Sequence, residues 1–120
     1  MSKVVRMSSA RFEEIVDTQI EKCRQMILKK AEEYAADEDR LHNFRVAAAL
    51  EGTSLRQALA GMMVKHVVSI YDMCFSHEDY TMAMWEEKIG DNLNYLFILK
   101  AVITEDLELL EAQLKFPLAS

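Results

Sequence analysis

Residues 55–74, LRQALAGMMVKHVVSIYDMC, form the most continuously apolar stretch of the chain and decide its fold class. A helix start signal precedes them. Thr53 and Ser54 can cap the N-terminus, and Gln57 stands three residues after Ser54, as in a capping box. The stretch therefore predicts a buried central helix.

This helix would carry one polar stripe. Lys65, Ser69 and Asp72 recur at i, i+4 and i+7, so they share one side of a rod whose other residues are mostly apolar. A buried charge without a partner costs several kcal/mol. The stripe thus predicts that another helix, another subunit or a ligand pairs with it. His66, in contrast, falls among apolar residues and is expected to be a core histidine.

The composition indicates a single all-α domain over residues 1–120. Half of the chain, 51%, is hydrophobic, and three glycines and one proline favour long helices over strands and turns. The net charge of −6 argues against a nucleic-acid duplex or an anionic membrane as partner. With no uncharged apolar run of membrane-spanning length and no signal-peptide pattern, we expect a cytoplasmic protein.

Apolar spacing predicts the other elements. A helix is expected over residues 12–34, a short helical piece over 45–50, and a long helix over 82–115 with a coiled-coil-like seam. The expected fold is a helical bundle of three main helices with a long C-terminal helix. Because three helices cannot cover that long rod, residues 104–114 are expected to pack against another subunit, giving a homo-oligomer.

The segment 37–44, DEDRLHNF, concentrates side chains capable of chemistry between two helical patterns. It can be a connecting turn whose Asp and Asn residues cap helices. It can also be a loop held over a scaffold, where ligand-contacting residues collect.

A second polar stripe suggests a site between helices. Glu87, Asp91 and Asn94 recur at the same spacing as the first stripe, and a short connection makes the two helices antiparallel neighbours. Three interpretations remain open. In the first, Lys65 and Asp91 form a structural ion pair and Asn94 fixes the helix register.

The second interpretation is enzymatic: Asp72, Glu87 and Asp91, with Glu33 as a further candidate, hold Mg²⁺. The third is ligand binding without a cofactor, in which cationic side chains grip a phosphate while amide and tyrosine side chains contact a base or ribose. The candidate ligand-binding residues are Tyr34, Arg40, His42, Asn43, Arg45, Lys65, Ser69, Asn94 and Tyr95.

Three segments carry a resemblance: KKAEEYAADEDRLHNFRVAAALEGTS (29–54), QALAGMMVKHVVSIYDM (57–73) and WEEKIGDNLNYLFILKAVI (85–103). Together they resemble small proteins of bacteriophages and prophages. More distantly, the EEKIGDNLNYL stretch, with the acids Glu32 and Glu33, is similar to MazG-like all-α nucleotide pyrophosphohydrolases. That resemblance implies a helical bundle, assembled as a dimer or tetramer, whose acids bind Mg²⁺ and nucleoside-triphosphate phosphates.

The chain departs from the pattern of that family. Glu87 and Asp91 are four residues apart instead of three, and Lys65 stands where the second helix should offer a carboxylate. A lysine repels a metal ion and attracts phosphate directly, so the departure weakens hydrolysis more than binding.

The sequence therefore predicts a phage-type protein of the host cytoplasm that binds a phosphorylated nucleotide or cyclic nucleotide signal, sequestering it without cleavage. A Mg²⁺-dependent pyrophosphohydrolase is the first alternative. The second is a protein-binding inhibitor or structural oligomer whose acidic surface includes Glu105, Asp106 and Glu108.

Overall fold

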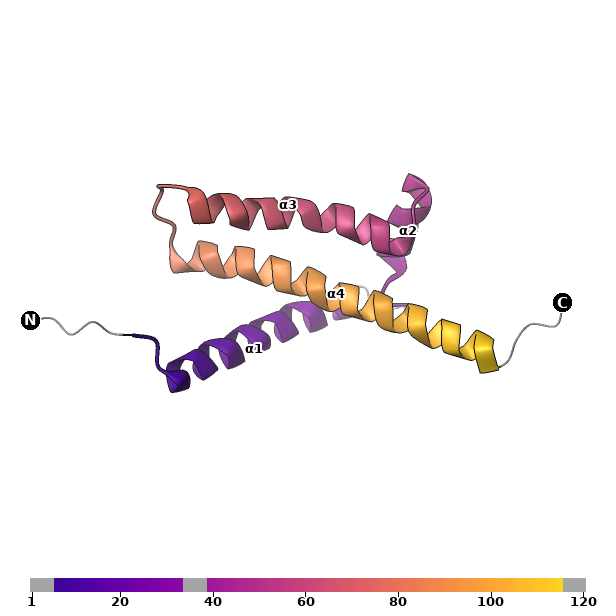
Figure 1. Ribbon diagram of the computed structural model, residues 1–120, viewed down its shortest axis with the longest axis horizontal. Helices are drawn as coiled ribbons and strands as arrows, with labels where there is room; N and C mark the ends of the chain where they lie inside the picture. The colour runs from indigo at the N-terminus through magenta and orange to yellow at the C-terminus, as the bar shows by residue number, and fades with distance from the viewer. Residues whose placement is uncertain (1–5, 34–38, 116–120) are drawn as a thin grey trace, which may run out of the picture.

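The computed structural model describes the backbone of residues 6–33 and 39–115, and the side chains of residues 6–29 and 39–115 (Figure 1). These residues form four helices and no strand: α1 (Ser9–Glu33), α2 (His42–Glu51), α3 (Leu55–Phe75) and α4 (Met82–Lys115). The prediction of an all-α fold with a long C-terminal helix is confirmed. The predicted helical piece over residues 45–50 is the longer helix α2.

Local sequence signals explain where α3 begins. The backbone N–H of Gln57 donates to Ser54 Oγ at 3.2 Å, and the Ser54 N–H donates to Gln57 Oε1 at 3.1 Å. This is the predicted capping box. Just before it, Gly52 ends α2 with a φ of 69°, a left-handed conformation that glycine adopts without strain.

The helices form an open bundle. Helices α3 and α4 run antiparallel side by side, α2 packs on α3, and α1 packs against α4 alone among the described helices (Figure 1). The buried centre consists of Leu41, Leu59 and Val102. Around it pack Phe44, Leu55, Met63, Tyr95, Ile98 and Leu99. The segment before α2 is thus anchored by Leu41, which places its polar neighbours beside α4.

The prediction of a buried central helix is wrong for α3 in the single chain. Only Ala58, Leu59 and Met73 of this helix are buried, while Lys65 and Asp72 are exposed. The reason is geometric: successive residues of a helix lie about 100° apart, and the side of α3 with Leu59 packs on α4. The stripe lies on the flank, so its charges are solvated and require no partner within this chain.

Helix α3 also has a composition that is unusual for a surface helix. Among the described helices, α3 is the one that is long and apolar enough to cross a membrane. Its most apolar stretch has a mean hydropathy of 1.2, and 17% of that stretch is buried. This finding concerns length and composition only.

Candidate ligand-binding site

A cavity of about 180 Å³ lies where α1, the segment 39–44 and α4 meet. Its walls combine apolar side chains with polar groups that come from three separate parts of the chain. The lining residues are Met26, Ile27, Asp39, Arg40, His42, Asn43, Phe44, Asp91, Asn94, Tyr95 and Ile98.

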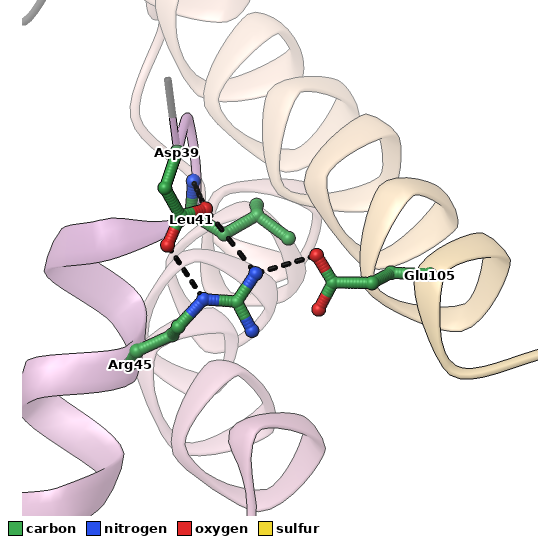
Figure 2. A network of polar contacts seen from close by, with 4 residues as sticks. All are labelled: Asp39, Leu41, Arg45 and Glu105. Carbon is green, nitrogen blue, oxygen red and sulfur yellow. Dashed lines mark hydrogen bonds and ion pairs between the residues drawn. The ribbon is translucent and has the colours of Figure 1, made fainter. Parts of the chain in front are cut away.

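A network of polar contacts fixes the segment 39–44 against α4 (Figure 2). Arg45 Nε donates to Asp39 Oδ2 at 2.7 Å, and Arg45 Nη2 donates to Asp39 Oδ1 at 3.2 Å and to Glu105 Oε2 at 2.5 Å. The Leu41 N–H also donates to Asp39 Oδ1, at 3.0 Å. Arg45 therefore joins the start of α2 to α4, which holds the cavity wall in place.

These contacts shift the protonation equilibria of the network. The hydrogen bonds from Arg45 hold the pKa of Asp39 below its usual value. The hydrogen bond to the Glu105 carboxylate, followed by the hydrogen bond to Asp39, raises the pKa of Arg45 above its usual value. At neutral pH, Arg45 is therefore a charged side chain already engaged by two carboxylates.

One side of the cavity offers hydrogen-bond donors. Arg40 and His42 line it, and among the described residues Arg40 Nη2 makes one long contact of 3.5 Å, to the Ile27 carbonyl. The N-cap residue of α2, Leu41, has no side-chain acceptor for the first turn. Among the described residues, the N–H groups of Asn43 and Phe44 have no acceptor. Such free N–H groups favour an anion at a helix N-terminus.

The opposite side, on α4, offers acceptors. Asn94 Oδ1 is buried and accepts no hydrogen bond from the residues that the structure describes. The carboxylate of Asp91 lines the same cavity, with Oδ2 at 3.7 Å from His66 Nδ1. A buried acceptor without a donor loses about 1–3 kcal/mol relative to a satisfied one, so it favours any ligand that brings a donor.

Two residues outside the predicted ligand-binding set support this acceptor side: His66, which the sequence predicts to be a core histidine, and Asn92. His66 of α3 packs its ring on Tyr95, with ring centroids 4.8 Å apart. Asn92 Nδ2 donates to the backbone carbonyl of His66 at 3.1 Å and to that of Lys88 at 2.8 Å. Asn92 therefore sets the register between α3 and α4, the role predicted for Asn94. The sequence signal for this role was the position of Asn92, a polar residue on the side of α4 that faces α3.

A second cavity of about 490 Å³ adjoins the first along α1 and α4. Met26, Asp91 and Asn94 line both cavities. The second cavity also carries Lys22, which pairs with Glu86 at 2.7 Å, and Lys29. Together the two cavities form a groove between α1 and α4 that is longer than either alone.

The structure brings together one part of the predicted ligand-binding set. Arg40, His42, Asn43, Asn94 and Tyr95 all line the first cavity. Arg45 lies beside it in the network described above. Lys65 and Ser69 lie on α3 and line neither of these cavities. Tyr34 lies outside the described residues.

The predicted magnesium ligands do not converge in the described part of the chain. Asp91 faces the groove, and Glu87 lines only the second cavity, whereas Asp72 is exposed on α3. Among the described residues, no group of three or more His, Cys, Asp and Glu side chains could hold a metal ion. The side chains of Glu32 and Glu33 lie outside the described residues.

Comparison with known proteins gives no match to any protein-family model, curated protein or solved structure.

Proposed function

We propose that the chain binds a phosphorylated nucleotide or a nucleotide-derived signal in the groove between α1, the segment 39–44 and α4. The observation that carries this proposal is the separation of donors and acceptors across the first cavity. Donors lie on the side of Arg40 and His42, and acceptors lie on the side of Asp91 and Asn94. A nucleotide has the matching arrangement, with acceptors on its phosphate and donors on its base.

The donor side suits a phosphate. Arg40 presents a planar guanidinium that can donate two parallel hydrogen bonds to phosphate oxygens. The free N–H groups at the start of α2 add donors that need no side chain. His42 contributes a further donor from the first position of the same helix. The phosphate would therefore lie against the first turn of α2.

The acceptor side suits a base. An exocyclic amino group would supply the donor that Asn94 Oδ1 lacks, and Asp91 can accept from a ring N–H. Phe44 and Ile98 supply apolar surface for the flat face of the ring, and Tyr95 is held beside them by His66. In this orientation the carboxylate of Asp91 lies away from the phosphate. The Asp39 carboxylate lines the phosphate side, and its ion pair with Arg45 offsets its charge.

Size extends the binding site into the second cavity. Pockets for small molecules typically enclose about 300–1,000 Å³, and the first cavity alone is smaller than that. A ligand larger than a single base would continue past Asn94 into the groove beside Lys29. This continuation is compatible with a linear or a cyclic nucleotide.

The proposal is binding without cleavage, as in a protein that sequesters a nucleotide signal. The described carboxylates offer no metal cluster that would activate water. The resemblance to small phage proteins supplies a setting, in which sequestration would lower the concentration of a host signal.

The test is a thermal-stability screen of the full chain against linear and cyclic nucleotides, with and without Mg²⁺. Each ligand is then recovered and chromatographed. A ligand at about 100 times its dissociation constant stabilises the native state by about 2.7 kcal/mol, which raises the melting temperature measurably. We expect a shift with the nucleotide recovered intact. Mg²⁺-dependent loss of the nucleotide would instead establish hydrolysis, and no shift with any nucleotide would refute the proposal.

Three variants locate the site once a ligand is identified. Arg40→Ala should weaken binding about tenfold or more, because a hydrogen bond to a charged group contributes about 1.5–3 kcal/mol. Arg56→Ala is the matched control, since Arg56 is an exposed arginine that pairs with Asp106 outside the groove. Lys65→Ala should also leave binding unchanged. Equal losses in Arg40→Ala and Arg56→Ala would indicate nonspecific charge attraction.

A further inference from the structure

Helix α3 has a second apolar face, opposite the side that packs on α4. It is formed by Ala60, Val64, Val67, Val68, Tyr71 and Phe75, all of which are exposed. The exposed fractions of Val64, Tyr71 and Phe75 are 56%, 61% and 69%. In Figure 1, α3 forms the outer edge of the hairpin of α3 and α4, with α2 at its N-terminal end; past that end, no other described helix runs along its far side.

We propose that this face binds the same face of a second copy of the chain, with the two α3 helices antiparallel about a two-fold axis between Val67 and Val68. The positions 60, 64, 67, 68, 71 and 75 are symmetric about that point. An antiparallel pair therefore sets Val64 opposite the partner's Tyr71, and Val67 opposite the partner's Val68. Such a self-complementary interface is what two-fold symmetry requires.

Side-chain size is complementary at the ends of the face. The same register places Ala60 opposite the partner's Phe75, so a small residue meets a large one at each end. Gly61 adds room next to Ala60, because a Cβ built there meets nothing within 4 Å. Tyr71 and Phe75 already contact each other, with ring centroids 4.7 Å apart, and would present a joint aromatic surface to this space.

Charge is complementary along one flank. Lys65 and Asp72 lie on the same edge of the apolar face, and a two-fold axis brings that edge of one helix beside the same edge of the other. Lys65 and the partner's Asp72 would then differ by two residues in register, about 3 Å along the axis. The interface would contain this ion pair twice. Lys65 and Asp72, which are solvated in the single chain, would thus each pair with the opposite charge of the second copy.

The amount of exposed surface supports burial against a second copy. Val64, Tyr71 and Phe75 are more than half exposed, and Val67 and Val68 are each 49% exposed. A standard protein interface removes about 1,600 Å² in total from the two partners. The α3 face therefore offers the kind of exposed apolar surface from which such an interface is built.

The first experiment measures molar mass by light scattering and sedimentation for the full chain. We expect a dimer or a multiple of it for the wild type, and loss of one two-fold association in the double variant V67E/V68E, because like charges would meet at the axis. Val46→Glu is the control, since Val46 is an exposed valine of another helix, α2. Circular dichroism checks that helix content is retained. An unchanged mass for V67E/V68E would overturn the proposal.

Cysteine cross-linking in a Cys74→Ser background tests the register. Under mild oxidation, Val68→Cys should form a covalent dimer with itself. Ala60→Cys alone should not, because the two copies of residue 60 would be about 22 Å apart along the axis. The combination of Ala60→Cys with Phe75→Cys should cross-link again. Cross-linking by Ala60→Cys alone would indicate a parallel pair and overturn the proposed arrangement.

Charge reversal tests the flank. Lys65→Glu and Asp72→Lys should each weaken the dimer about tenfold, since each creates two like-charge pairs, and K65E/D72K should restore it. If either reversal has no effect, or the double variant is no better than the singles, the ion pairs are refuted. A membrane is the other candidate for such a face. A wild-type chain that stays monomeric and sediments with phosphatidylcholine vesicles through Val67 and Val68 would overturn self-association.

Discussion

Asp39 and Arg45 face each other across the first turn of α2, with 2.7 Å between Oδ2 and Nε. Arg45 also reaches Glu105, so one guanidinium joins two carboxylates from distant parts of the chain. We expect Arg45→Met to lower the free energy of unfolding by about 1 kcal/mol, the upper range for a partly exposed ion pair. Urea unfolding measures this. Arg56→Met removes a single, more exposed pair and should cost less; an equal or larger loss in Arg56→Met would contradict the network.

The same network predicts how stability depends on pH. Because the pKa of Asp39 is lowered in the folded state, the unfolded chain binds its proton more tightly. The stabilisation from Asp39 is therefore present above the ordinary aspartate pKa of about 4, and is lost as the pH falls through the lower, folded pKa. Arg45 stays protonated throughout and adds no pH dependence in this range.

Asp39→Asn is the variant that isolates this effect. Wild type should exceed Asp39→Asn in unfolding free energy at about pH 5, and the difference should shrink below about pH 4. Urea titrations at several pH values measure both chains. A difference that grows on acidification would reverse the predicted sign.

Asn92 and Asn94 lie two residues apart on α4 and should respond oppositely to removal. Asn92→Ala deletes the amide that bridges to the His66 carbonyl and should cost about 1 kcal/mol. Asn94→Ala deletes an acceptor without a donor among the described residues, so stability should stay level or rise. Both changes replace asparagine with the same helix-favouring residue. The difference in unfolding free energy between Asn92→Ala and Asn94→Ala, measured by thermal and urea unfolding, therefore reports on the hydrogen bonds of the two amides. Equal effects of the two variants would contradict the assignment of the bridging hydrogen bond to Asn92.

Leu59 and Leu50 provide a matched test of the core. Leu59 is fully buried against Leu41 and Val102, whereas Leu50 is 84% exposed. Leu59→Ala should lower the free energy of unfolding by about 2–5 kcal/mol through lost burial and a residual cavity. Leu50→Ala should change it by less than about 0.5 kcal/mol in the monomeric range of concentration. A comparable loss in both would mean that Leu50 is covered in solution.

The elements of this fold follow closely from local signals. The capping box at Ser54 and Gln57 and the left-handed Gly52 fixed the start of α3, and the long apolar seam predicted α4 through Lys115. These signals depend on residues within one or two turns of each other. Short-range geometry decides them, so the sequence contains what is needed.

The faces of α3 could not be predicted in the same way. A helix with one apolar stripe reveals which side is buried, but α3 is apolar on two opposite sides, and the pattern alone does not choose between them. In the structure, the side of α3 with Leu59 and His66 packs on α4, and Lys65 lies away from Asp91. Lys65 and His66 are adjacent, so they lie about 100° apart around the helix. Because His66 faces α4, Lys65 does not, and Lys65 is no longer a candidate phosphate ligand.

The candidate site was predictable in its loop and only partly in its helices. Arg40, His42 and Asn43 stand together in the sequence, so their proximity required no tertiary information. Their position against Asn94 and Tyr95 depends on Leu41 entering the core and on Arg45 reaching Glu105. Both are contacts between residues far apart in the chain, which spacing does not specify.

Among the described helices, α1 packs on α4 alone, yet it supplies Met26 and Ile27 to the cavity wall. The helix with the fewest supports therefore closes the site. Undocking of α1 would open the groove without disturbing the hairpin of α3 and α4, and a ligand that bridges the groove would oppose that undocking. Occupancy and docking are then thermodynamically linked, so amide hydrogen exchange along the first four turns of α1 should slow when the groove is filled.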